Sequence, residues 1–395
     1  MTKLFMFEKP LGMRDTFPDL YEIKDQTKKK MENAMKLWGY KFIETPSLEY
    51  YETVGEASAI LDQQLFKLLD QQGHTLVLRP DMTAPIARIA ASKLLKDEAP
   101  LRLAYSNSVF RAQQREGGRP AEFEQVGIEC IGDDSVSADA EVIALMVSVL
   151  KEAGLEHFKI SIGHIGFVQE LFTQIVGTEE RADTLRRYLY EKNYVGYRQH
   201  VNELALSSID KERLFRFLQL RGSENVLGEA HSLLEGGRGL RALEQLNDLW
   251  NILRDYEVEQ YVKFDLSLVS HMSYYSGILF EVYGDNVGFA IGNGGRYNKL
   301  LEKFGKNSGA TGFGLRLDYV LEAMQVELSS TLQQCVLFSD ERRKEAISLA
   351  RDLRNEGNEV VLQNWKGVGD VDEFTKGISN VHFVVGQDRK GGESS

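Results

Sequence analysis

Residues 101–131 contain two strand-like segments separated by a loop rich in glycine and arginine. Over residues 125–130, three apolar side chains alternate with Gln125, Gly127 and Glu129. A period of two places the glutamine and the glutamate on one face of a strand and the apolar side chains on the other. Because Gly127 has no side chain, it leaves room for a ligand to approach the backbone. The stretch predicts an antiparallel strand pair that carries either a polar cup or an ordinary solvated face.

Two N-terminal segments have clear periodicity. Residues 19–38 place apolar side chains at helical spacing from Leu20 onward, and Gly39 follows at the C-terminal cap position. Residues 40–52 alternate like a strand, but they contain Pro46, which confines a strand to a sheet edge or an interface. We therefore expect a helix with a buried stripe, followed by an edge strand.

Residues 264–284 and 287–297 read as two strands joined by a turn. In an uninterrupted strand, Tyr274 and Tyr275 would lie on opposite faces. A pair of tyrosines in a strand is usually explained by packing across strands, so these residues do not by themselves predict a site.

The composition excludes several classes of protein. A formal net charge of −12 and a pI near 5.3 argue against wrapping nucleic acid, which requires lysine and arginine to neutralise phosphates. Cys130 and Cys335 lack the paired spacing of a disulfide framework or a zinc site. No apolar run reaches membrane-spanning length, and the first residues lack a signal-peptide pattern. We expect a soluble cytoplasmic protein.

Four stretches in chain order resemble motifs of the histidyl-tRNA synthetases, which are class II aminoacyl-tRNA synthetases. The family's motif 2 is matched by Phe110-Arg111, Gly118-Arg119, Phe123, Gln125, Gly127 and Glu129, with the same loop length. The segments LRPDMTAPIAR, SYYSGILFEVY and GNGGRYNKL are similar to the family's LRPEGT, DYYTGTVFE and GGRYDGL segments. The resemblance covers residues 8–325.

The resemblance implies an α+β fold. Residues 1–325 would form a class II synthetase-like domain, an antiparallel sheet flanked by helices, with a helical insertion at about 166–255. Residues 333–395 alternate between strands and helices and resemble a truncated form of the family's small α/β anticodon-binding domain.

The resemblance also implies a histidine site that needs no metal and no cofactor. Asp81 stands where the synthetases use glutamate to hold the substrate ammonium, and Glu129 and Tyr275 match the residues beside the imidazole. The implied histidine-binding residues are Asp81, Thr83, Arg111, Gln125, Glu129, Tyr274 and Tyr275. The residues alone leave another role open for two of them, because Asp81 or Thr83 can cap the helix that follows.

Arginines of the synthetase pattern are missing from three places. Ser270 stands at the arginine of the RGLDYY run, Tyr319 stands at that of GLERL, and the family's RYRQF reads Arg119-Pro120-Ala121-Glu122-Phe123. Arg316 is expected to point away, because a strand passes into a helix there. Amino-acid activation builds negative charge on a phosphate, and one well-placed donor contributes roughly 3–4 kcal/mol to such a transition state. We therefore expect synthetase chemistry to be lost.

One synthetase-like family fits this loss: the regulatory subunits of ATP phosphoribosyltransferase, the first enzyme of histidine biosynthesis. The resemblance implies a non-catalytic subunit that senses L-histidine and works with a separate short-form catalytic chain. It also implies a homodimer within a hetero-oligomer, built around the Pro46 segment, with no nucleic acid or membrane as partner. An active histidyl-tRNA synthetase remains an alternative, as does a synthetase-like chain that acts on another amino acid or carrier.

Overall fold

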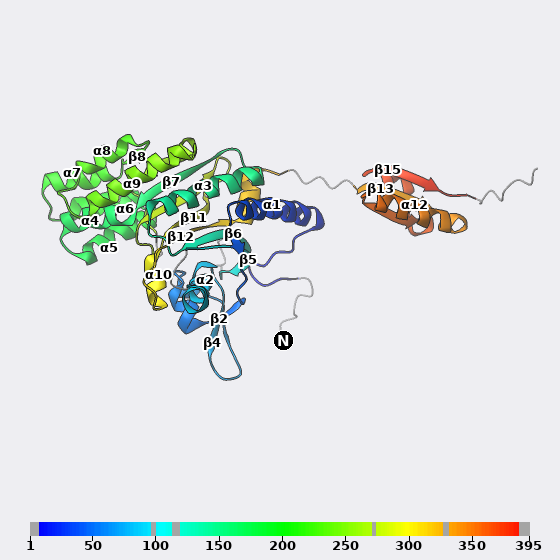
Figure 1. The fold of residues 1–395 in the computed structure, drawn as a ribbon, viewed down its shortest axis with the longest axis horizontal. Coiled ribbons are helices and arrows are strands. Elements are labelled where there is room, and N and C mark those ends of the chain that lie inside the picture. The colour runs from blue at the N-terminus through cyan, green and yellow to red at the C-terminus, as the bar shows by residue number, and fades with distance from the viewer. Residues whose placement is uncertain (1–7, 96–99, 113–118, 271–273, 327–331, 387–395) are drawn as a thin grey trace, which may run out of the picture. The chain divides into compact units, whose positions relative to one another are not determined.

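The computed structural model describes residues 8–95, 100–112, 119–270, 274–326 and 332–386 (Figure 1). The chain divides into two compact units, residues 1–326 and 327–395. Each unit is described by itself.

The larger unit is built on a sheet whose described strands run in the order β1-β5-β6-β12-β11-β10-β7-β9-β8. Neighbouring strands from β5 to β7 are antiparallel, and β1 pairs with β5 and β9 with β7 in parallel. The strand bounds are β1 Lys41–Phe42, β5 Leu101–Phe110, β6 Glu122–Ile131, β7 Phe158–His164, β8 Arg221–Gly222, β9 Val262–Asp265, β10 Ile278–Gly284, β11 Ala290–Arg296 and β12 Ala310–Arg316.

The predicted strand pair of residues 101–131 is confirmed as β5 and β6, with Tyr105 opposite Gly127. The apolar positions of β6 pack into the main core, which α1, α3 and α11 complete. Figure 1 shows α1 and α3 lying along this face of the sheet. The helices are α1 Pro18–Leu37, α3 Val136–Ala153 and α11 Leu317–Met324. The opposite face of β6, which carries Gln125 and Glu129, belongs to the pocket described below.

A second layer covers the pocket face of the sheet. It contains α2 (Thr83–Ile89), α10 (Asn298–Lys303) and a small antiparallel sheet in the order β2-β4-β3. The strands of this sheet are β2 Leu48–Tyr50, β3 Lys67–Leu69 and β4 Thr75–Leu78. The buried side chains of this layer, among them Val77, Met82 and Ile86, pack against Tyr105 of β5. The pocket therefore lies between the large sheet and a second packed layer.

Residues 165–255 are mainly helical. The helices are α4 Ile165–Val176, α5 Glu179–Tyr190, α6 Tyr194–Glu203, α7 Ser208–Phe217, α8 Asn225–His231 and α9 Arg238–Asp255. Their apolar stripes join the main core, and α9 contacts both β7 and α3. None of the helices in the described part of the chain is both long and apolar enough to cross a membrane.

The smaller unit has three parallel strands in the order β14-β13-β15. Its strands are β13 Leu332–Phe338, β14 Val360–Asn364 and β15 Ile378–Val384, and its helices are α12 Arg343–Asn355 and α13 Val371–Thr375. Its core joins Val336, Phe338 and Val384 of the sheet to Ala346 and Ala350 of α12.

Two expectations for the N-terminal segments are wrong in part. Residues 40–52 do not form one strand, because β1 joins the large sheet and β2 the small one. Pro46 lies between them and cannot donate a backbone hydrogen bond, so no single ladder can continue through it. The helix of residues 19–38 is confirmed as α1, but Leu20 is 37% exposed and lies outside its buried stripe.

The strand expected over residues 264–284 is also wrong. β9 pairs with one side of β7 and β10 with the other, so the chain must cross over β7 between them. Asp265 and Ser267 begin a turn in which the Leu268 amide donates to the Asp265 carbonyl at 3.1 Å. Residues 271–273 of the expected strand lie outside the described residues.

Candidate ligand-binding site

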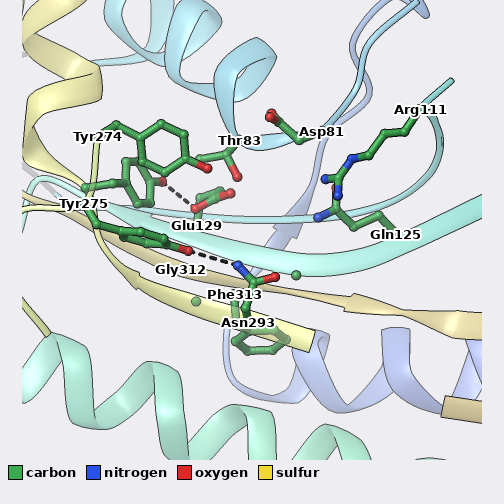
Figure 2. Close-up of a pocket in the computed structure, with 13 residues that line it drawn as sticks. Asp81, Thr83, Arg111, Gln125, Glu129, Tyr274, Tyr275, Asn293, Gly312 and Phe313 are labelled. Atoms are coloured by element: carbon green, nitrogen blue, oxygen red, sulfur yellow. Dashed lines mark hydrogen bonds between the residues drawn. The ribbon is translucent and has the colours of Figure 1, made fainter. Parts of the chain in front are cut away.

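A pocket opens between the sheet and the α2 layer, and its empty space of about 370 Å³ includes part of the open solvent. All seven predicted site residues line it: Asp81, Thr83, Arg111, Gln125, Glu129, Tyr274 and Tyr275. Figure 2 shows the two tyrosines at one end and Arg111 at the other, with Glu129 between them. The structure thus brings together predicted residues from four separate segments of the sequence.

Glu129 is a buried carboxyl of the pocket, with 1% of its surface exposed. The Tyr297 hydroxyl donates a hydrogen bond to its Oε2. Burial raises the pKa of Glu129 to about 8, although hydrogen bonds from Tyr297 and Thr83 oppose the shift. Glu129 therefore keeps its proton at neutral pH and can donate a hydrogen bond to a ligand.

This raised pKa predicts how stability depends on pH. An unfolded glutamate has an ordinary pKa of 4.5, whereas the pKa of folded Glu129 is about 8. Between these values unfolding releases a proton, so the unfolding free energy of the wild type falls as pH rises. Glu129→Gln does not titrate. In denaturant unfolding from about pH 4.5 to about pH 8, we expect the variant to gain stability relative to the wild type. A constant difference across this range would contradict the raised pKa.

Asp81 caps α2 and also faces the pocket. Its Oδ1 accepts a hydrogen bond from the Ala84 amide at 3.0 Å, which confirms the capping role. Its Oδ2 is buried and has no hydrogen-bond partner among the described residues. Burial raises the pKa of Asp81, and the Ala84 amide and Arg111 oppose the shift. The unsatisfied oxygen is an acceptor that a ligand ammonium can use.

Gln125 and Arg111 complete this end of the pocket. The Gln125 Oε1 accepts from the Met82 amide at 3.1 Å, which ties β6 to the start of α2. The Arg111 Nε donates to the Pro80 carbonyl at 2.8 Å. Burial lowers the pKa of Arg111, Asp81 opposes that shift, and the nearby charge of Arg316 adds to it.

The expectation that Arg316 points away is wrong in part, because Arg316 lies on the pocket face of β12 although it is not among the residues that line the pocket. β12 continues to Arg316, which lies opposite Gln125 in the ladder. Since side chains alternate along a strand, Arg316 is on the same face as Gly312 and Gly314, which line the pocket. Its guanidinium carbon lies 3.7 Å from the ring centroid of Phe123 and 3.8 Å from that of Tyr319.

Tyr274 and Tyr275 both line the pocket, so their expected placement on opposite faces is wrong. They precede β10 in a turn, where strand alternation does not apply. Their ring centroids lie 5.2 Å apart in an edge contact. The Tyr275 hydroxyl accepts from the Asn293 Nδ2 at 3.2 Å, as Figure 2 shows.

Sequence reasoning missed Tyr297, Asn293 and the glycines of β12. Tyr297 and Asn293 belong to the GNGGRYNKL segment, which matches a family motif but carries no residue of the predicted site. A Cβ on Gly312 would lie 2.1 Å from the Glu129 Oε2, so only glycine leaves the carboxyl accessible. Within the described residues, no group of three or more histidine, cysteine, aspartate or glutamate side chains is placed to hold a metal ion.

The comparisons with known proteins agree with this architecture. Residues 12–320 match the family described as "Histidyl-tRNA synthetase", and residues 335–386 match "Histidyl-tRNA synthetase HisZ, C-terminal domain". A histidyl-tRNA synthetase of known structure from Nostoc sp. PCC 7120 is 20% identical, with a TM-score of 0.78 over 94% of this chain and 88% of its own. At that identity the likeness concerns the fold, and it confirms the predicted class II synthetase fold.

Closer relatives are named for a regulatory role. A protein of Geobacillus sp. (strain WCH70) named "ATP phosphoribosyltransferase regulatory subunit" is 60% identical, over 98% of this chain and 99% of its own. A protein of the same name from Bacillus subtilis (strain 168) is 57% identical, over 97% of this chain and 98% of its own. A crystal structure titled as such a regulatory subunit/histidyl-tRNA synthetase from Bacillus halodurans C is 56% identical, with a TM-score of 0.91 over 98% of this chain and 100% of its own. These relatives favour the regulatory prediction over an active synthetase, and the chain belongs to the family of ATP phosphoribosyltransferase regulatory subunits.

Proposed function

We propose that this chain is the non-catalytic regulatory subunit of an ATP phosphoribosyltransferase and binds L-histidine in the pocket around Glu129. It would act with a separate short-form catalytic chain, in the first step of histidine biosynthesis. The observation that carries the proposal is a pocket that combines Glu129, Asp81 and Arg111, while Ser270 and Tyr319 stand at arginine positions of the synthetase pattern.

The groups of the pocket suit a zwitterion with an imidazole ring. Protonated Glu129 can donate to a ring nitrogen, and the Tyr275 hydroxyl lies near the same end. The free Oδ2 of Asp81 can accept from the ammonium. Arg111 supplies a cation for the carboxylate. An amino acid without the ring would leave buried polar groups unpaired, which is a source of discrimination.

Regulation requires that histidine bind two states of the complex with different affinities. A coupling free energy of about 1–3 kcal/mol is typical for such linkage. The pocket suits this role because the sheet holds Glu129, whereas the separate α2 layer holds Asp81 and Thr83. A ligand that contacts both layers can favour one spacing between them.

We also propose a cytoplasmic homodimer within the hetero-oligomer. Both cysteines are buried free thiols, as expected in a reducing compartment. Leu48 and Tyr50 of β2 are 45% and 49% exposed, and Leu68 of β3 is 45% exposed on the same face of the small sheet. Apolar side chains grouped on one small sheet are typical of a surface that another chain covers.

Two measurements on the purified chain test this function. ATP–pyrophosphate exchange with histidine is expected to stay at background, because the activating arginines are missing. In a thermal-shift series across the amino acids, histidine alone is expected to raise the unfolding temperature. Robust exchange would instead identify an active synthetase, and stabilisation by another amino acid would identify a different ligand.

A further inference from the structure

We infer that Arg316 is a specificity-determining residue that forms, with Arg111, the subsite for the carboxylate of the bound amino acid. This inference rests on the proposed function and adds a residue that the sequence pattern does not assign. It starts from the pocket face of β12, although Arg316 itself is not among the residues that line the pocket. Gly312 and Gly314 line the pocket on the same face of the strand on which Arg316 lies. Along this face of β12, Gly312 lies beside Glu129, Gly314 follows, and Arg316 comes next.

Two aromatic rings hold Arg316 in place. Its guanidinium carbon lies 3.7 Å from the ring centroid of Phe123 and 3.8 Å from that of Tyr319. The Arg111 guanidinium carbon is 5.3 Å from the same Phe123 centroid. A guanidinium stacked between rings keeps its charge and directs its N–H groups outward at the edge. The packing fixes the side chain before any ligand arrives, which reduces the entropic cost of binding.

The hydrogen bonds of Arg316 are incomplete. One terminal nitrogen donates to Asp318 at 3.1 Å. The Nε is buried and has no hydrogen-bond partner within the described residues, and the same holds for the Asp318 Oδ1. A buried donor without a partner is uncommon and calls for an explanation. An anion at the edge of the guanidinium would accept the hydrogen bond of this Nε.

The charge balance also favours an anion. Arg316 is near enough to Arg111 to help lower its pKa, so the two cations repel each other. Burial raises the pKa of Glu129 to about 8, so this carboxyl offsets little of the positive charge at neutral pH. Asp318 forms an ion pair with Arg316 at 3.1 Å. A ligand carboxylate at this end would relieve the repulsion.

The same side chain limits what else can bind. Arg316 occupies the space between Phe123 and Tyr319, where a flat ring would otherwise stack. A planar heterocycle would have to displace the guanidinium and lose both ring contacts. Arg316 thus selects a small carboxylate and disfavours a nucleobase at the same position.

Calorimetry with three ligands tests the subsite in the full-length chain. L-Histidinol has the ring and the ammonium of histidine but lacks its carboxylate, and inorganic phosphate is the competing anion. Arg316→Gln is expected to weaken histidine binding about tenfold or more and to leave histidinol affinity unchanged. Asp318→Asn removes the neutralising carboxylate, so it is expected to strengthen histidine binding and again to leave histidinol unchanged. Arg198→Gln is the matched control, because Arg198 also lies over a ring, 5.8 Å from the centroid of Phe215, in the helical region.

The outcomes separate this inference from the proposed function. If Arg316→Gln weakens histidine and histidinol equally, Arg316 only supports the fold of the pocket and the inference is wrong. It is also wrong if the variant abolishes phosphate binding but keeps the preference for histidine over histidinol. If the wild-type chain binds neither histidine nor histidinol, both the inference and the histidine-binding function are wrong.

Discussion

Gly314→Ala is expected to lower the affinity of the chain for histidine by roughly 10- to 100-fold, which corresponds to about 1.4–2.8 kcal/mol. A Cβ at this position would lie 2.4 Å from the Gln125 Nε2 and 3.1 Å from the Tyr105 hydroxyl. Both neighbours are side-chain ends, so the fold can adjust. The adjustment, however, moves Gln125 and breaks its bond from the Met82 amide. Calorimetry with histidine measures the effect.

The control for this change is Gly228→Ala. Gly228 lies in α8, where an added Cβ would meet nothing within 4 Å. Helix propensity favours alanine there, so stability is expected to be kept or slightly raised, with histidine affinity unchanged. Wild-type histidine affinity in Gly314→Ala would show that the ligand does not lie over β12.

Arg296→Met is expected to destabilise the larger unit by about 3–5 kcal/mol. The Arg296 Nε donates to the Asp139 Oδ2 at 3.0 Å, and its terminal nitrogens donate to the carbonyls of Asp133 and Ser135, each at 2.9 Å. Asp139 is 2% exposed, so its carboxyl would be left buried without a cation. Arg296 directly precedes Tyr297, whose hydroxyl donates to Glu129 in the pocket. Histidine affinity should therefore fall together with stability.

Chemical denaturation of the full chain measures this effect, and two further variants make it specific. Arg351→Met removes an arginine whose ion pair with Asp352 is long, at 3.7 Å, and whose side chain is 68% exposed. No measurable loss of stability is therefore expected. The double variant Arg296→Met, Asp139→Asn removes both charges and should be more stable than Arg296→Met alone. Equal stability of the single and double variants would mean that the ion pair is not what holds this region together.

Local patterns predicted much of the larger unit. The alternation in residues 125–130 correctly separated the core face of β6 from the face that lines the pocket. The helix of residues 19–38 is confirmed as α1, and the expected glycine after it, Gly39, has a left-handed φ of 84°. These features depend on a few neighbouring residues, so the sequence contains the information needed to predict them.

Features that depend on distant strands could not be predicted in the same way. The position of Arg316 follows from the register of β12 against β6, and the crossing of β7 separates β9 from β10. Tyr297 reaches Glu129 across 168 residues of sequence. The seven predicted residues line one pocket because the family resemblance carried long-range information that periodicity lacks, and their role in binding histidine remains a prediction.

The most direct test of the regulatory role is a steady-state ATP phosphoribosyltransferase assay with a short-form catalytic chain. The catalytic chain alone is expected to be nearly inactive, addition of this chain is expected to give activity, and L-histidine is expected to suppress it. Gly314→Ala in place of the wild type should keep the activation and lose the suppression at the same histidine concentration. A catalytic chain whose activity is the same with and without this protein would contradict the account.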